Sequence, residues 1–319
     1  LGGFASAFFL YGIALIFGVA GSTNLPKVAD GLARLNVGSS DSMILAGVAL
    51  LLVGFAFKVS LVPFHVWTPD VYQGAPTPIT ALMASVGKVA AFSALARVFL
   101  TGLSGRADDW APAIYVLAVV TLVVGSVVAV VQTDVKRMLA YSSISHAGFI
   151  LVGLEAATHT SSSDATLGVS SISSYLLIYS LLVIGTFAVA SVVVGEGDAT
   201  LDSFKGLGKS NPVLALAMTI LLLAQAGVPV TSGFIAKFGV IRAAVSVESY
   251  LLAVIAMIAA IVAAFLYLKV LATIWLKQSE SLNIEPLSWS QKLVIGGSVT
   301  MTFVLGLYPQ ILLKQLVNF

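Results

Sequence analysis

Long apolar runs recur along this chain and constrain its fold more than any other feature. A helix needs about 20 mostly apolar residues to cross the hydrocarbon of a bilayer. Runs of this kind occur at residues 4–21, 43–65, 79–100, 112–132, 138–155, 174–195, 212–246, 250–276 and 291–308. Of all residues, 59% are hydrophobic and 9% are charged, far from the balance of a water-soluble domain. The sequence therefore predicts an all-α, polytopic transmembrane bundle, with residues 1–319 forming a single membrane domain of nine helical crossings.

Short polar connectors separate the runs, so no independent soluble domain fits between them. The chain opens at Leu1, and no basic segment precedes the first run. We therefore interpret this run as a mature helix and the chain as N-terminally truncated. The formal net charge is +2 and the basic residues are scattered singly, which argues against a nucleic-acid partner. The chain has no cysteine, so any redox centre is expected to belong to another chain.

The basic residues of alternate loops give a nearly balanced count for membrane orientation. The larger group, which we place on the cytoplasmic face, is Lys136, Arg137, Lys205, Lys209, Lys277 and Lys292. The opposite group is Lys27, Arg34, Arg106, Arg242 and Lys314.

Three lysines stand inside apolar runs, where charge is costly. Lys58 lies late in the second run, Lys88 near the middle of the third and Lys237 within the seventh. A lysine facing lipid at the centre of a helix costs about 2.5–3.5 kcal/mol on insertion scales, so these side chains are expected to face the bundle interior or water. Arg97 and Lys269 lie close to the ends of their runs, where snorkelling to the headgroups explains them.

Two runs carry signals of helix breaking. Pro63 follows Lys58 in the second run, and Pro229 stands with Gly227 and Gly233 in the seventh. Proline removes a backbone donor and clashes with the preceding turn, so both runs are predicted to be discontinuous helices. Lys58 precedes its break whereas a lysine follows the other, the mirrored order expected of an inverted repeat whose broken helices line an ion pathway. The alternative is a proline kink used only for packing.

Burial makes the charged form of lysine costly, and a nearby carboxylate compensates for that cost. A buried lysine with a movable carboxylate partner can therefore serve as a proton switch. All fourteen Asp and Glu residues fall in connectors or at the ends of runs. We therefore expect the buried lysines to be held neutral, or to have a carboxylate partner outside this sequence.

Histidine titrates near neutral pH and suits proton relays. His65, beside the first break, is a candidate, with a helix-cap or packing role as the alternative. His146 is another; it lies among serines that more often form hydrogen bonds between helices. His159 stands in a polar connector and is predicted to be solvated. The four Trp and nine Tyr residues are interpreted as interfacial anchors or packing groups.

Three segments together resemble the antiporter-like subunits of respiratory complex I. They are "FKVSLVPFHVWTPDVYQGAPTPITALMASVGKVAAF", "TDVKRMLAYSSISHAGFILVGL" and "LAQAGVPVTSGFIAKF". The lysine in "GFIAKF" is similar to that of the N-type subunit. Such subunits have fourteen helices in two inverted five-helix repeats, so the nine runs here would correspond to the sixth through fourteenth. The glutamate of the fifth helix, usual partner of the lysine matching Lys58, has no counterpart, which agrees with a truncated chain.

The resemblance implies a role for each candidate residue. Lys58 would load protons at the first broken helix, Lys88 would connect the central hydrophilic axis, and Lys237 would serve near the exit. His65, His146, Pro63 and Pro229 would support them.

The implied function is proton translocation in NADH:quinone oxidoreductase, coupled to quinone reduction elsewhere in the complex. No cofactor or metal is expected in this chain; NADH, FMN, iron–sulfur clusters and quinone would belong to partner subunits. The expected partners are other membrane subunits of complex I, and the expected location is a bacterial inner membrane. Two alternatives remain: a subunit of a multisubunit cation/proton antiporter, and a structural membrane spacer that does not pump.

Overall fold

The computed structural model describes residues 1–34, 41–159, 164–195, 197–278, 284 and 286–312, and these are helical apart from turns and one isolated β-bridge. The α-helices are α1 (Gly2–Ala20), α2 (Leu25–Ala33), α3 (Asp41–Lys58), α4 (Trp67–Gly74), α5 (Thr77–Leu82), α6 (Lys88–Arg97), α7 (Ala107–Val131), α8 (Val135–Ala156), α9 (Asp164–Val194), α10 (Leu207–Ser210), α11 (Pro212–Ala226), α12 (Ser232–Ser246), α13 (Tyr250–Leu276) and α14 (Trp289–Leu307). The π-helical segment Met83–Gly87 joins α5 to α6, and a second one, Val98–Gly102, extends α6, so that residues 77–102 form one continuous stretch.

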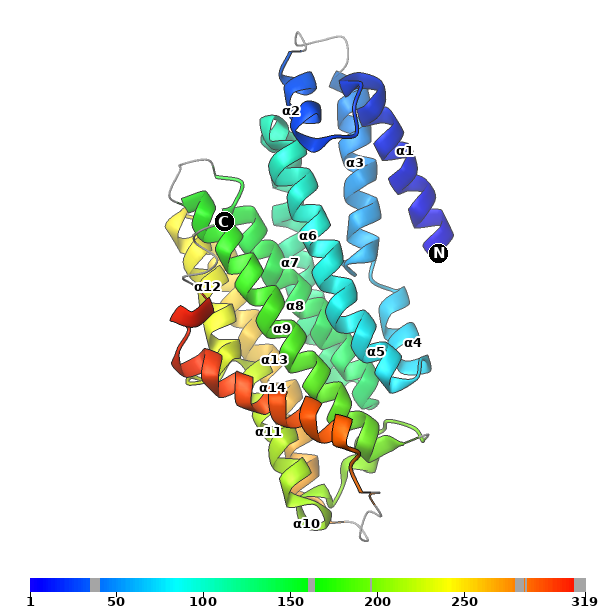
Figure 1. Cartoon of the computed structure of the whole chain (residues 1–319), viewed down its shortest axis with the longest axis vertical. Coiled ribbons are helices and arrows are strands. Elements are labelled where there is room, and N and C mark those ends of the chain that lie inside the picture. The colour runs from blue at the N-terminus through cyan, green and yellow to red at the C-terminus, as the bar shows by residue number, and fades with distance from the viewer. Residues whose placement is uncertain (35–40, 160–163, 196, 279–283, 285, 313–319) are drawn as a thin grey trace.

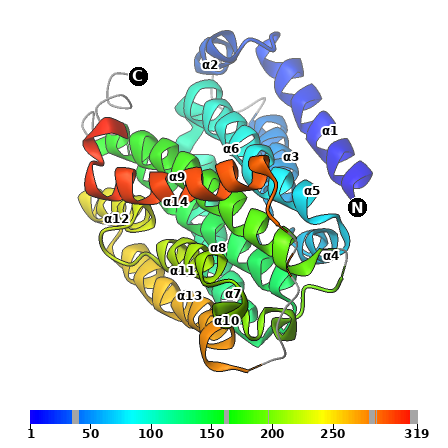
Figure 2. The same cartoon turned by 60° about the horizontal axis from the view of Figure 1, so that its bottom comes forward.

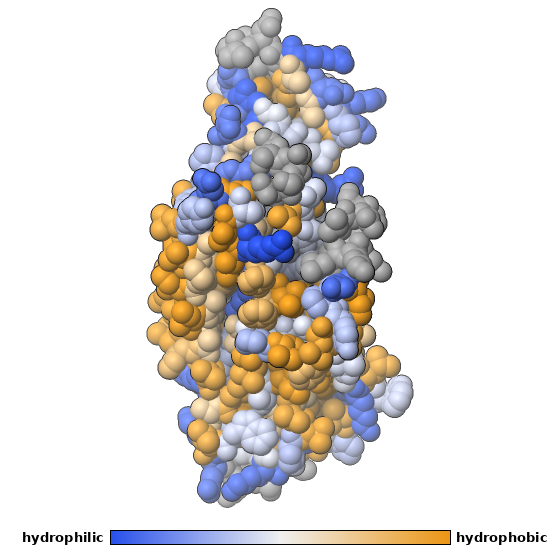
Figure 3. Space-filling view, turned by 90° about the vertical axis from the view of Figure 1, so that its left-hand side faces the viewer, coloured by the Kyte–Doolittle hydropathy of each residue, from blue (hydrophilic) through white to orange (hydrophobic). Residues whose placement is uncertain are grey.

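Eight helical stretches among the described residues are long and apolar enough, by length and composition, to cross a membrane. They overlap eight of the nine predicted runs. Hydrophobic residues cover most of the middle of the side shown in Figure 3, and hydrophilic residues gather toward its two ends. The all-α membrane bundle is confirmed. The remaining run, 212–246, is divided into α11 and α12, and the ninth crossing that these two helices would form together stays a prediction.

The start of α9 was predicted too late. The apolar run begins at residue 174, whereas the helix already begins at Asp164. The serines of this first part turn their hydroxyls back to carbonyls of their own helix; Ser170, for example, donates to Leu167 O and Ser174 to Ser170 O. Because these hydroxyls are satisfied within the helix, the polar segment continues α9 instead of forming a loop.

Helix α8 runs through the middle of the bundle, packed against α7, α9, α12 and α13 (Figures 1 and 2). Nearly all of its side chains are buried. It approaches α7 closely at two glycines: a Cβ atom at Gly125 would lie 2.6 Å from Ser145 N, and one at Gly148 would lie 2.8 Å from the Leu122 side chain. Glycine at these positions lets α8 occupy the core of the molecule.

The first predicted break is confirmed. Helix α3 ends at Lys58 and the chain becomes helical again at Trp67. Side chains satisfy backbone groups at the break: Val62 N–H, in the unwound segment, donates to Thr121 Oγ1 at 3.1 Å, and the indole Nε1 of Trp67 donates to Phe57 O, in the last turn of α3, at 2.9 Å. The unwound segment is thus paired within the protein, as backbone at membrane depth must be.

The second predicted break is also confirmed. Helix α11 ends at Ala226, Gly227 takes a left-handed conformation (φ 92°), and α12 begins at Ser232. Pro229 lies in the connecting turn. The two helices meet so closely that a Cβ atom on Gly233 would overlap the carbonyl oxygen of Ala224. The separation between the two half-helices therefore depends on the absence of a side chain at residue 233.

Candidate functional site

Lys88 is buried in the bundle, with 3% of its surface exposed. It follows the π-helical turn Met83–Gly87 directly, and such turns inside helices often mark functional positions. Its Nζ atom donates a hydrogen bond of 2.5 Å to the backbone carbonyl of Ser143 on α8. No carboxylate of the described residues contacts it. The amine is thus held by neutral oxygen alone.

Lys237 is 6% exposed and lies just after the second break. Its Nζ atom donates to Ala226 O at 2.9 Å, a carbonyl that the end of α11 leaves free. It also lies 5.0 Å from the ring centroid of Phe149 on α8. The negative end of a helix dipole and an aromatic face both favour a cation. The break therefore forms the binding position of the lysine amine.

His146 on α8 stands between these two lysines. Its Nδ1 atom is hydrogen-bonded to the hydroxyl of Tyr175 at 2.7 Å, and its Nε2 atom to the hydroxyl of Tyr267 at 3.2 Å. The Tyr267 hydroxyl also bonds to Ser142 Oγ at 2.6 Å. The imidazole is therefore connected through both nitrogens to buried hydroxyl groups.

Tyr179 completes the connection toward Lys88. Its hydroxyl donates to Ser143 Oγ at 2.7 Å, and its ring centroid lies 4.8 Å from that of His146. On the other side, Tyr175 stacks on Phe149, the ring over which Lys237 lies. A continuous series of contacts thus joins the two buried lysines through α8 and α9. We call this series, with Ser142 and Tyr267, the polar axis.

Apart from Phe149, the polar axis consists of groups that can exchange protons. Hydroxyl groups both donate and accept hydrogen bonds, and neutral imidazole does so through its two nitrogens. The lysines at either end can carry a charge or lose it. Ring contacts join these groups at two points, between Tyr179 and His146 and between Phe149 and Lys237.

Lys58 and His65 lie outside the polar axis. The Lys58 side chain is exposed at the end of α3. His65 is half-buried beside Tyr141, with ring centroids 6.2 Å apart, and its buried Nδ1 atom has no hydrogen-bond partner among the described residues. Pro63 and Pro229 lie in the two breaks. The roles predicted for these residues stay predictions.

The sequence interpretation missed the tyrosines of the polar axis, which it assigned to anchoring or packing. One signal was available: Tyr175 and Tyr179 are four residues apart and share a helix face. The interpretation of Lys269 as a snorkelling side chain stays a prediction, but it did not include the contacts that this side chain makes. Its Nζ atom donates to Val130 O at 3.1 Å and Gln132 O at 2.9 Å, where α7 ends.

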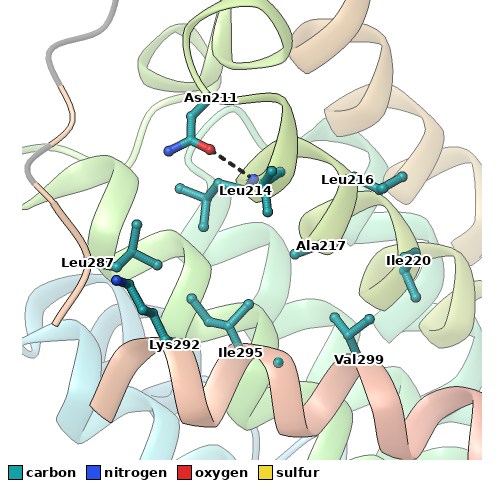
Figure 4. A pocket seen from close by; sticks show the side chains of 11 residues that line it. Asn211, Leu214, Leu216, Ala217, Ile220, Leu287, Lys292, Ile295 and Val299 are labelled. Atoms are coloured by element: carbon teal, nitrogen blue, oxygen red, sulfur yellow. Dashed lines mark hydrogen bonds between the residues drawn. The ribbon is translucent and has the colours of Figure 1, made fainter. Parts of the chain in front are cut away.

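The groove shown in Figure 4 lies away from the predicted site residues. This groove of about 360 Å³ between α11 and α14 is lined mainly by apolar side chains such as Leu214, Ile220 and Ile295, and Lys292 lies at its edge (Figure 4). None of the predicted site residues lines it. Within the part of the chain that the structure describes, no three His, Asp or Glu side chains gather as metal ligands would.

Two broken helices and lysines buried in a polar axis define the class of antiporter-like membrane proteins. Residues 1–263 match the family described as NADH:quinone oxidoreductase/Mrp antiporter, TM, and the chain belongs to this family. It is 45% identical to NADH-quinone oxidoreductase subunit N of Mycobacterium bovis over 318 residues, which cover 97% of this chain and 58% of that protein. The Parafrankia subunit N is 46% identical, covering 98% of this chain and 59% of the relative. The chain thus spans somewhat more than half the length of these relatives.

Solved structures agree on the fold. A chain of respiratory complex I from Thermus thermophilus with bound aureothin matches with a TM-score of 0.82 and 33% identity, covering 99% of this chain and 66% of that one. A chain of the Mrp complex from Dietzia matches with a TM-score of 0.85 at 22% identity, covering 99% and 65% respectively, which shows the fold alone.

Proposed function

We propose that the chain is part of a proton-translocating membrane subunit of an NADH:quinone oxidoreductase, of the N type. One observation carries the proposal: among the described residues, Lys88 and Lys237 are both buried without a carboxylate contact, and the hydrogen bonds and ring contacts of the polar axis join them. The assignment to an NADH:quinone oxidoreductase rests on the names of the relatives. The location that follows is a bacterial inner membrane, among other membrane subunits of that complex.

The proposed mechanism is an electrostatic relay. A proton enters at Lys58 beside the first break, passes to Lys88, and crosses the polar axis through His146 to Lys237. Each lysine binds a proton when the charge of its neighbour leaves, because two charges in a low-dielectric interior repel strongly. The chain itself performs no reaction on a substrate. NADH, FMN, iron–sulfur clusters and quinone belong, in this proposal, to partner subunits.

Replacing Lys237 by alanine tests the proposal most directly. We expect Lys237→Ala, in the full-length subunit within its complex, to reduce NADH-driven proton uptake into membrane vesicles to less than about a tenth of wild type, the scale of losing one proton-transfer group. Lys209→Ala, which removes an exposed lysine, is the matched control. Assembly is checked on a native gel. Full pumping by an assembled Lys237→Ala complex would favour the structural spacer and contradict the relay.

Tyr267→Phe removes one hydroxyl from the polar axis. The variant loses the bonds to Ser142 and to His146 Nε2 and keeps the packed ring, which is 1% exposed. We expect proton translocation to slow by about threefold to tenfold, since Tyr175 still bonds to the imidazole. Stopped-flow measurement of proton uptake in vesicles gives the rate. Tyr115→Phe on α7, a half-buried tyrosine outside the axis, should pump at the wild-type rate.

An independent cation/proton antiporter is the second candidate, because the Mrp complex of Dietzia contains a chain of the same fold. Antiport would continue without redox chemistry. Purification under mild detergent separates the two: redox subunits that copurify with the full-length protein support the oxidoreductase, whereas NADH-independent exchange of Na⁺ for H⁺ supports the antiporter.

A further inference from the structure

Glu155 is a buried acid that the relay above does not use. It lies at the end of α8, and only 5% of its surface is exposed. Its Oε1 atom accepts a hydrogen bond from Ser249 Oγ at 2.7 Å, whereas its buried Oε2 atom has no hydrogen-bond partner in the part of the chain that the structure describes. A carboxylate oxygen buried without a partner is costly unless it binds a proton or water. Glu155 is therefore suited to binding a proton at Oε2.

A histidine connects this acid to the surface. Nε2 of His159 lies 3.1 Å from Glu155 Oε1, and the His159 side chain is 45% exposed whereas that of Glu155 is 6% exposed. The prediction that His159 is merely solvated was thus incomplete. Glu248, beside Ser249, is exposed. Among the described residues, α7, α9, α12 and α13 bring no charged side chain into hydrogen-bond contact with Glu155, so His159 is its one ionisable contact there.

A cavity between α9 and α12 lies beside the helical turn of Lys237. Its volume is about 240 Å³, and apolar side chains line most of it; the polar members of the lining are Ser170, Ser171, Ser174 and Arg242. The Ser171 hydroxyl also packs on α8 at Gly153, where a Cβ atom would lie 2.8 Å away from it. The three hydroxyls donate to carbonyls of their own helix and can still accept, so they and Arg242 are the partners that water would have in this cavity.

We propose that Glu155, His159 and Ser249 form a proton-exchange station through which protons pass between the Lys237 end of the polar axis and the membrane surface where α8 ends. This inference rests on the proposed function. In the resting state the carboxylate is paired with protonated His159. A proton arriving through water binds Oε2 of Glu155, which neutralises the carboxylate and weakens the pair. His159 then releases its proton to bulk water and recovers one from Glu155, so that one proton has crossed and both groups have returned to their first state.

The test compares Glu155→Gln with Glu248→Gln in the assembled, full-length complex. Glutamine keeps the acceptor for Ser249 and removes the ionisable oxygen, so a purely structural tie would survive the change. We expect Glu155→Gln to lower proton translocation at least about threefold, as the loss of a proton-transfer group does. We also expect the pH profile of Glu155→Gln to differ from that of wild type. Glu248→Gln should match wild type in both respects.

The outcomes separate this inference from the proposed function. Wild-type pumping with an unchanged pH profile in Glu155→Gln, combined with a loss of pumping in Lys237→Ala, overturns the exchange station alone. Wild-type pumping in both variants overturns the proposed function as well. Should Glu155→Gln fail to assemble, His159→Gln decides, because that side chain is half-exposed: a changed pH profile supports the station, and an unchanged one overturns it.

Discussion

A methionine in place of Lys88 is expected to abolish proton translocation without weakening the fold. Methionine has nearly the length of lysine and fills the same buried space without the amine. Lys88 Nζ makes one hydrogen bond to Ser143 O and lies 6.0 Å from the ring centroid of Tyr179, so the variant removes the end of the polar axis nearest α6. We expect pumping below about a tenth of wild type, since no other basic side chain of the described residues contacts Ser143 or Tyr179.

We expect the thermal stability of the Lys88→Met complex to be maintained or raised, although its proton translocation is lost. Burying an amine costs free energy, and replacing buried charged groups with well-packed apolar ones is often neutral or stabilising by about 1–4 kcal/mol. We therefore expect Lys88→Met complexes to assemble fully and to melt no lower than wild type in a thermal-shift assay. Lys209→Met, which changes an exposed lysine, controls for the loss of one positive charge. A Lys88→Met complex that pumps normally would remove Lys88 from the relay.

Gly233→Ala is expected to have the largest structural effect in the molecule. The added methyl group would overlap the Ala224 carbonyl oxygen and lie 2.6 Å from its carbonyl carbon, both of them backbone atoms of α11. Because backbone cannot rotate away as a side chain can, α12 has to move as a unit, at a cost of about 3 kcal/mol or more. Lys237 would be carried away from Ala226 O.

Two measurements check this prediction. The amount of assembled complex on a native gel should fall several-fold for Gly233→Ala, and the protein that does assemble should pump poorly. Gly239→Ala is a matched control on the same helix, since its added Cβ atom meets only Ser171 Cβ at 3.8 Å. Alanine favours helix over glycine by about 1 kcal/mol, so the control should be at least as stable as wild type. Equal assembly of both variants would show that α12 can shift at little cost.

The sequence was sufficient for features whose signal is local. A lysine amid apolar residues is visible in a few letters, as at Lys88, and so is a proline or glycine cluster in a run too long for one helix, as around Pro229. The hydrogen bonds of the polar axis have no such signal. Tyr267 meets His146 across 121 residues of sequence, and no helical or strand period relates two positions on different helices. The contact between Glu155 and Ser249 could not be predicted for the same reason, since the two residues are 94 positions apart in the sequence.

Burial of polar side chains at the ends of runs could not be predicted from the sequence. Glu155 stands at the end of a run, where its position indicates neither burial nor exposure, and the structure shows that it is buried. Its neighbours at that end, Ser249 and His159, supply the contacts that water would otherwise make. Sequence hydropathy records what a side chain prefers in isolation, and it does not record which partners the fold will bring to it.

The close approach of α7 and α8 at Gly125 limits how the structure could change in the proposed relay. Ser142, Ser143 and His146 all project from α8, and the backbone of this helix is held against α7 where there is no room even for a methyl group. Sliding or tilting α8 would break that contact along its length. The spacing among the three side chains is therefore fixed, and the events available to them are rotations of hydroxyls and of the imidazole ring. In the proposed relay, the side chains on α8 would therefore gain and lose protons without a change in the conformation of the protein backbone.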